Sequence, residues 1–88
     1  MKNKIEKTSQ SDAAKLFRSH KLDGLKNTIF GHIDQLRFAR FMHSLELWKK
    51  AEQDARSFCK ALVDNDHLSN DEALMVYDFI IYHGKNRH

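Results

Sequence analysis

The stretch that decides the fold is DQLRFARFMHSLELWKKAEQDARSFCKALV, residues 34–63. It contains neither Gly nor Pro, the two residues that most often interrupt a helix. Its apolar residues recur at alternating intervals of four and three with one gap, as in the core-facing stripe of a bundle helix. The members of this stripe are Phe41, Leu45, Trp48, Ala55, Cys59 and Leu62. We predict one long helix over residues 34–63, with Asp34 as its N-cap and Ile33 packed on Phe38.

The length of this helix favours self-association. At ~1.5 Å per residue it would be about 45 Å long. A compact domain of 88 residues has a radius of gyration of only ~12 Å. One copy of the chain could not cover such a helix, so we predict a homodimer.

On either side of this stretch the sequence predicts further helices. Apolar periodicity indicates two short helices before it, over residues 12–20 and 23–30, and Gly31 would lie just past the second. The polar run DNDH at residues 64–67 predicts a loop after it.

The last helix is predicted over residues 70–83. Ser69 is a good N-cap, Glu72 completes a capping box with it, and Gly84 is a suitable stop. After the first turn, only Asp78 interrupts a run of apolar residues. A helix that is apolar all round must be buried on several sides, and a second chain would supply the missing cover.

Composition supports an all-α class, because three Gly and no Pro leave little material for tight turns or long loops. We predict a small bundle of three to four helices, built on the long central helix and completed by dimerisation. Residues 11–84 would form the single domain, with a flexible basic tail over residues 1–10 and a flexible tail over residues 85–88.

The sequence lacks the motifs of common catalytic and metal sites. It has no HExxH, no CxxC and no Gly-rich phosphate loop, and no two of its six His are three or four residues apart. Cys59 belongs to the apolar stripe, where a thiol is buried rather than nucleophilic. We therefore expect no enzyme activity, no cofactor and no metal.

The sequence does not predict export or membrane insertion. The charged start MKNKIEKTSQSD lacks the apolar core of a signal peptide, and no run approaches the ~20 apolar residues of a membrane span. A single Cys excludes a disulfide framework and fits a reducing compartment. We expect a cytoplasmic protein with no membrane partner.

The first of two functional hypotheses is a non-enzymatic regulator or adaptor that acts by protein–protein interaction through an oligomeric helical bundle. It follows from the surplus apolar surface, since large aromatic and aliphatic side chains supply most of the energy of protein interfaces. The predicted anchors are Phe41, Leu45, Trp48, Phe79 and Ile80. Which anchors face a second copy and which face another protein is left open by the sequence.

The alternative hypothesis is a nucleic-acid-binding regulator that uses a basic N-terminal half on a dimeric scaffold. Residues 1–31 hold seven Lys/Arg against three Asp/Glu, residues 32–63 six against four, and residues 64–88 two against five. The predicted phosphate contacts are Lys15, Arg18, Lys21, Lys26, Arg37 and Arg40, with Lys49, Arg56 and Lys60 as a second group. The acidic last third, the net charge of only +3 and the lack of a recognisable DNA-binding motif count against it.

Overall fold

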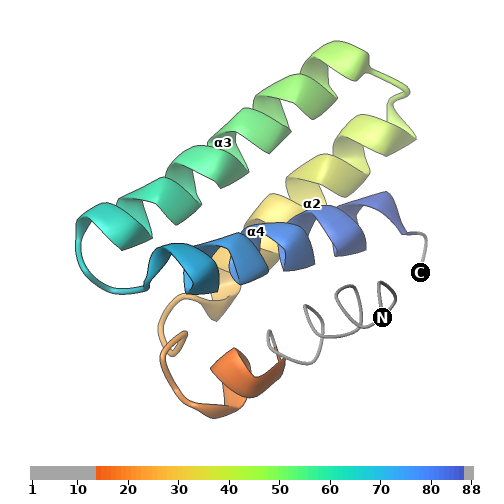
Figure 1. Ribbon diagram of the computed structural model, residues 1–88. Coiled ribbons are helices and arrows are strands. Elements are labelled where there is room, and N and C mark those ends of the chain that lie inside the picture. The colour runs from red at the N-terminus through yellow and green to blue at the C-terminus, as the bar shows by residue number, and fades with distance from the viewer. Residues whose placement is uncertain (1–13, 87–88) are drawn as a thin grey trace, which may run out of the picture.

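The computed structural model describes residues 14–86, and helices are the only regular secondary structure within them. A short helical segment at residues 14–18 precedes three longer helices, α2 (Lys26–Phe41), α3 (Leu45–Asp64) and α4 (Asn70–Lys85) (Figure 1). The predicted all-α bundle of three to four helices is confirmed. The predicted tail over residues 1–10 lies outside the described residues, as do the last two residues of the chain.

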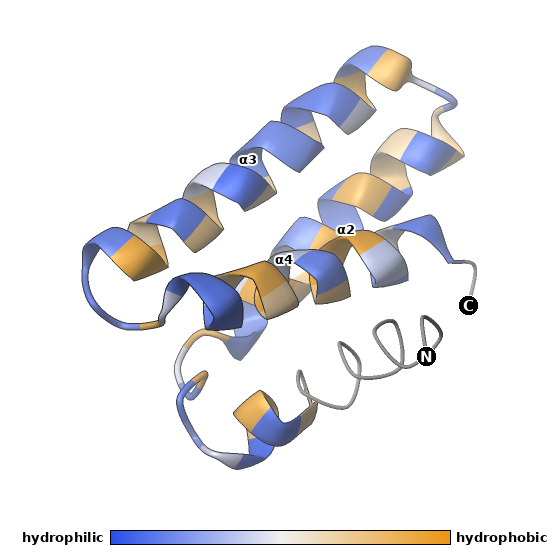
Figure 2. Ribbon diagram, in the orientation of Figure 1, coloured by the Kyte–Doolittle hydropathy of each residue, from blue (hydrophilic) through white to orange (hydrophobic). Residues whose placement is uncertain are grey.

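The helices α2 and α3 run antiparallel beside each other, and α4 packs across both (Figure 1). Each turns an apolar side toward the others (Figure 2). The core includes Ile29, Ile33 and Leu36 from α2, Ala55, Cys59 and Leu62 from α3, and Ala73, Val76 and Ile80 from α4. These residues recur at intervals of three and four, so the helical periodicity of the sequence forms the core.

The predicted single helix over residues 34–63 is wrong, because the chain reverses direction within it. α2 ends in a Schellman motif. The N–H of Ser44 donates to the carbonyl oxygen of Ala39 (3.0 Å). The N–H of His43 donates to the carbonyl oxygen of Arg40 (3.0 Å), and His43 has the left-handed backbone that this motif requires, with a φ of 53°. These bonds satisfy two carbonyls in the last turn of α2 and end the helix without Gly or Pro.

A new helix begins directly after this turn. The hydroxyl oxygen of Ser44 accepts a hydrogen bond from the N–H of Leu47 (3.1 Å), which makes Ser44 the N-cap of α3. The described part of the chain measures 34 × 33 × 19 Å, which is shorter than the ~45 Å expected of one long helix. The first argument for self-association therefore no longer holds.

The predicted boundaries around α2 are also wrong. α2 begins at Lys26 and continues through Gly31 and Asp34, so Gly31 does not end a helix and Asp34 does not cap one. Ile33 is buried in the core whereas Phe38 is exposed, so these two side chains lie on different sides of α2. The core-facing spacing of α2 continues across Gly31, and this outweighs the weak helix preference of a single Gly.

The predicted start of α4 is confirmed. The hydroxyl oxygen of Ser69 accepts from the N–H of Glu72 (3.2 Å), and the carboxylate of Glu72 accepts from the N–H of Ser69 (3.0 Å). The predicted stop at Gly84 is wrong, because Gly84 is buried and α4 continues to Lys85. Leu74 remains 58 % exposed, so α4 is not buried on all sides within one copy of the chain.

The chain before α2 is held against the turn between α3 and α4. The Lys21 ammonium lies 2.6 Å from Oε2 of Glu72. The Nε2 atom of His67 donates to the carbonyl oxygen of Lys21 (2.9 Å), and Leu16 and Leu22 are buried in the core. In Figure 1 this segment lies far from the turn that joins α2 to α3.

Candidate interaction surface

Exposed apolar side chains gather where α2 turns into α3. Eight large hydrophobic residues are exposed within residues 14–86, and five of them belong to this turn and the adjoining helix ends. They are Phe38, Phe41, Met42, Leu45 and Leu47, and we call them the apolar corner. Phe41 is 78 % exposed and Leu45 is 67 % exposed. Clustered apolar surface of this kind marks an interaction site or a ligand groove.

The fold exposes these residues because α4 covers only part of the α2–α3 pair. Near its C-terminal end, α4 packs on α2 through Gly84, which lies against Leu36. The turn between α2 and α3 extends past the end of α4 (Figure 1), and hydrophobic residues continue to the start of α3 (Figure 2). The apolar corner is therefore left without cover from the described part of α4.

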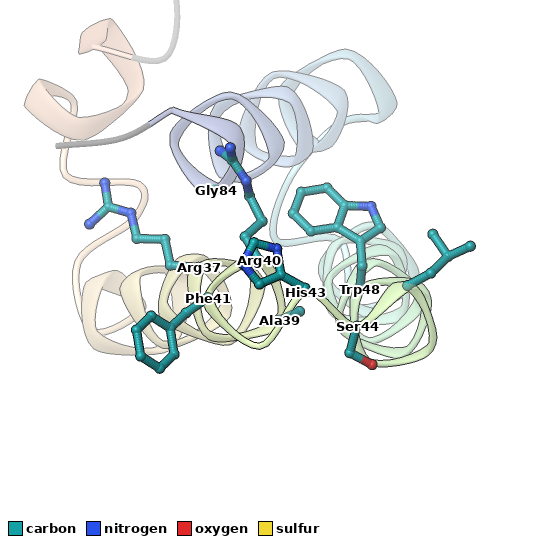
Figure 3. Close-up of a pocket in the computed structure, with 9 residues that line it drawn as sticks. Arg37, Ala39, Arg40, Phe41, His43, Ser44, Trp48 and Gly84 are labelled. Atoms are coloured by element: carbon teal, nitrogen blue, oxygen red, sulfur yellow. The ribbon is translucent and has the colours of Figure 1, made fainter.

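A groove of about 690 Å³ lies beside the apolar corner, between the end of α2, the start of α3 and the end of α4 (Figure 3). We call it the basic groove. Its lining residues are Arg37, Ala39, Arg40, Phe41, His43, Ser44, Leu45, Trp48 and Gly84. Two of them are Arg, one is His, and none is Asp or Glu.

The side chains in the basic groove differ in how they are held. Arg40 and Trp48 extend toward α4 from α2 and α3, whereas Phe41 points away from it (Figure 3). Arg37 donates through Nε to the carbonyl oxygen of His83 (3.2 Å), at the end of α4 where partial negative charge accumulates. Within residues 14–86, the guanidinium of Arg40 makes no hydrogen bond or ion pair. Arg40 is thus a cation whose donors are available to a ligand.

A second groove, of about 360 Å³, shares no residue with the first. We call it the mixed-charge groove, and its lining residues are Asp34, Gln35, Phe38, Leu47, Lys50, Ala51 and Asp54. At about 100° per residue, Asp34 and Phe38 lie on a different side of α2 from Arg37 and Arg40. The apolar corner is therefore flanked by two grooves. The Lys, Arg, Asp and Glu residues that line the basic groove are all Arg, whereas those of the mixed-charge groove have both signs of charge.

The structure separates the predicted interface residues. Phe41 and Leu45 belong to the apolar corner, and the half-buried Trp48 lines the basic groove. Phe79 lies elsewhere and is half-buried, with its ring packed on two other Phe rings of the same chain. Ile80 is 0 % exposed, so its prediction as an interface anchor is wrong. Because nearly all residues of α4 after its first turn are apolar, the sequence did not show which of them face the core.

Of the predicted basic residues, the structure brings only Arg37 and Arg40 together in the basic groove. The other four are exposed around the opposite end of α2, and they are Lys15, Arg18, Lys21 and Lys26. Lys21 is already paired with Glu72. A single basic face that contains all six residues does not form.

The second group of basic residues lies on α3 and is partly engaged. Lys60 pairs with Asp64 (3.0 Å), and Arg56 donates to the hydroxyl oxygen of Tyr77 (3.4 Å). Lys49 is exposed. None of the three lines the basic groove.

Sequence reasoning missed the turn at His43 and Ser44, which shapes this surface. The available signal was Ser44 followed by Glu46, a capping residue with an acidic residue in the next turn. The left-handed backbone of His43 has no comparable signal, since Gly is the usual residue at that position.

Other chemistry in the described part of the chain is limited. Burial raises the pKa of the Cys59 thiol to about 11, so the thiol is protonated at neutral pH. No three His, Cys, Asp or Glu residues between 14 and 86 lie close enough together to hold a metal ion. Over the same span, the helices lack the combination of length and apolar character that crossing a bilayer requires.

Comparisons with models of known protein families, with curated proteins and with solved structures give no match for this chain. The chemistry of the apolar corner and its two grooves is therefore the basis for a functional assignment.

Proposed function

We propose that this protein is a non-enzymatic helical regulator or adaptor that acts by protein–protein interaction in the cytoplasm. The observation that carries the proposal is the apolar corner, with five large hydrophobic side chains exposed at one turn. Burying one such side chain fully contributes about 1.5–3 kcal/mol, so a partner that covers several of them gains much of the free energy of a stable complex. Polar groups in the two grooves would fix the orientation of that partner. The cytoplasm is proposed because Cys59 is a free thiol.

Affinity capture from a lysate of the cells that make the protein tests this proposal. The full chain would be compared with a Phe41→Ser/Leu45→Ser variant and with Leu74→Ser, an exposed residue of α4 outside the apolar corner. We expect wild type and Leu74→Ser to retain the same protein, identified by mass spectrometry, and the double variant to lose it. Equal capture by all three, or capture of no protein by wild type, would refute the proposal.

We further propose that two copies pair through the mixed-charge groove. A two-fold interface must be self-complementary, because the same patch meets itself. Phe38 and Leu47 would pack on their counterparts in the second copy. Lys50 would then face the carboxylate of Asp34 or Asp54 across the axis. The basic groove is a poorer self-interface, since a two-fold axis would bring its cations together.

Light scattering coupled to size exclusion tests the pairing. The wild-type chain is expected at twice its 10.4 kDa mass, and so is the matched control Leu74→Ser. Phe38→Ser/Leu47→Ser is expected at the mass of one chain. A wild-type mass of one chain at high protein concentration would contradict the dimer and leave the adaptor proposal standing.

The alternative proposal is a nucleic-acid-binding regulator. It is supported by Arg37 and Arg40, which line one groove without a carboxylate, beside an indole at Trp48 that a base could stack on. Gel shifts with duplex DNA and structured RNA at roughly 50 and 150 mM salt test it. A salt-sensitive shift that Arg40→Glu abolishes would support this alternative, and no shift at either salt concentration would exclude it.

A further inference from the structure

We propose that the basic groove takes an acidic amphipathic segment of a partner protein, whose apolar side chains pack on Trp48 and whose carboxylates bind Arg37 and Arg40. This inference rests on the proposed function, because it names the class of partner that the interaction module would bind. Its starting point is the lining of the groove, which combines two Arg and one His with three large apolar residues and has no carboxylate of its own.

The two guanidinium groups are arranged to receive carboxylates. The Arg40 guanidinium makes no hydrogen bond or ion pair within residues 14–86. Arg37 uses Nε for the carbonyl of His83, so both of its Nη groups can still donate. Guanidinium and carboxylate groups match in geometry and form two parallel hydrogen bonds, which are stronger than bonds between neutral groups. An acidic side chain would therefore bind here with a defined orientation.

The chain's own ends are poor occupants of the basic groove. Residues 1–13 contain three Lys against two acidic residues, and Arg87 and His88 follow α4. In both stretches the basic side chains outnumber the acidic ones, so neither complements a basic groove. We therefore place the occupant on another molecule.

A second copy of this chain is also a poor occupant. Acidic residues outnumber basic ones only in residues 64–88, five against two. Within that part, Asp64 is already paired with Lys60, and Glu72 with Lys21. A contact between this end of one copy and the basic groove of another would be head-to-tail, which continues into an open assembly unless the rotation closes.

The form of the groove suits a helix that carries apolar anchors on one face. Amphipathic helices bind grooves between helices through anchors spaced three and four residues apart. Phe41 and Leu45 belong to both the apolar corner and the lining of the basic groove, so apolar surface continues from one to the other. A helix lying along this surface would bury its apolar face there and present acidic residues at one edge to Arg37 and Arg40.

Peptide display on the full chain tests the inference. A library of random 16-residue peptides would be selected against wild type, against Arg40→Glu, and against the matched control Lys49→Glu. Lys49 is exposed on α3 and does not line the groove, so this variant makes the same charge change outside the site. We expect wild type and Lys49→Glu to enrich peptides that combine Asp or Glu with Leu, Phe or Trp. We expect Arg40→Glu to lose the acidic enrichment.

A titration with the most enriched peptide gives the second measurement. Trp48 is the only Trp of the chain, so its emission reports directly on the groove. We expect the peptide to shift this emission and Arg40→Glu to raise the Kd at least tenfold, with far-UV circular dichroism showing that the variant is folded. We also expect raised salt to weaken binding, because the attraction is between exposed charges.

Three outcomes would overturn the inference. One is selection of no peptide, or of neutral or basic peptides, by wild type. Another is equal affinity of the enriched peptide for wild type and Arg40→Glu. The third is a shift of Trp48 emission by a 20-nucleotide single strand that competes with the peptide, which would assign the groove to nucleic acid. In the first two cases the adaptor proposal would still be supported if the affinity-capture experiment retained a protein with wild type and lost it with Phe41→Ser/Leu45→Ser.

Discussion

Gly84 of α4 packs against Leu36 of α2 so closely that a Cβ atom on Gly84 would lie 2.7 Å from both the Cβ and the Cδ1 atoms of Leu36. The absence of a side chain at Gly84 thus determines how near the end of α4 comes to α2. Gly84 also lines the basic groove, and α4 ends one residue later. The same contact that completes the core therefore sets one wall of the candidate site.

Gly84→Ala is expected to lower the free energy of unfolding. Overpacking of this kind costs about 1–3 kcal/mol, which exceeds the ~1 kcal/mol that Ala gains over Gly inside a helix. Gly31→Ala is the matched control, because a Cβ there meets no atom within 4 Å and should raise stability by about 1 kcal/mol. Urea unfolding followed by far-UV circular dichroism measures both. Stabilisation by both substitutions would contradict the close packing at Gly84.

His43→Gly is expected to stabilise the protein. The left-handed backbone of His43 (φ 53°) costs an L-residue about 1–2 kcal/mol, and Gly avoids this cost at a smaller loss of chain entropy. The net gain should be about 0.5–1 kcal/mol in the same urea experiment. Met42→Gly is the control, since Met42 has a φ of −80° and Gly would bring only the entropy loss. A continuous helix over residues 34–63 predicts the opposite sign for His43→Gly, a loss of ~1 kcal/mol.

Local spacing in the sequence predicts some features of the helices but not the break at His43. The capping box at Ser69 and Glu72 and the burial of Cys59 follow from local spacing, and both are present. The break at His43 does not follow from spacing, because the stripe of apolar residues continues through it at helical intervals. A Schellman turn needs one left-handed residue and can form without Gly, so the sequence carries only the weak signal of Ser44 as an N-cap.

The basic groove could not be predicted, because it depends on contacts between distant parts of the chain. The sequence predicts Gly84 as a helix stop, whereas in the structure Gly84 lets α4 approach Leu36. The sequence predicts Arg37 and Arg40 as phosphate contacts, but their grouping with Trp48 in one groove requires the turn at His43. Such relationships follow from the crossing of helices, which local periodicity does not specify.

Cys59 is expected to be unreactive in the folded protein. Burial raises the pKa of its thiol to about 11, and only the thiolate attacks a disulfide reagent. At pH 8, Ellman's reagent should label native Cys59 at least about 100-fold more slowly than Cys59 in urea, where its pKa returns to ~8.5. Absorbance of the released thiolate gives both rates. Equal rates would show that α3 is not packed as described.

Glu72→Gln is expected to reduce the loss of stability in acid. The hydrogen bond from the Lys21 ammonium, with a smaller contribution from the backbone N–H of Ser69, lowers the pKa of Glu72 below its ordinary value. Because the folded state has the lower pKa, this stabilisation is fully present above the unfolded pKa of ~4.3 and is lost as the pH falls through the folded value. Gln preserves the capping box but removes the charge.

The measurement is the urea midpoint of unfolding between pH 7 and pH 3. Wild type should lose more stability over this range than Glu72→Gln, and at pH 7 the variant should be less stable by about 1 kcal/mol or less, since the pair with Lys21 is partly exposed. Glu46→Gln is the matched control, because Glu46 is also an acidic residue in the first turn of a helix. It should leave most of the acid dependence in place. An identical pH profile for wild type and Glu72→Gln would show that the Lys21 contact does not stabilise the fold.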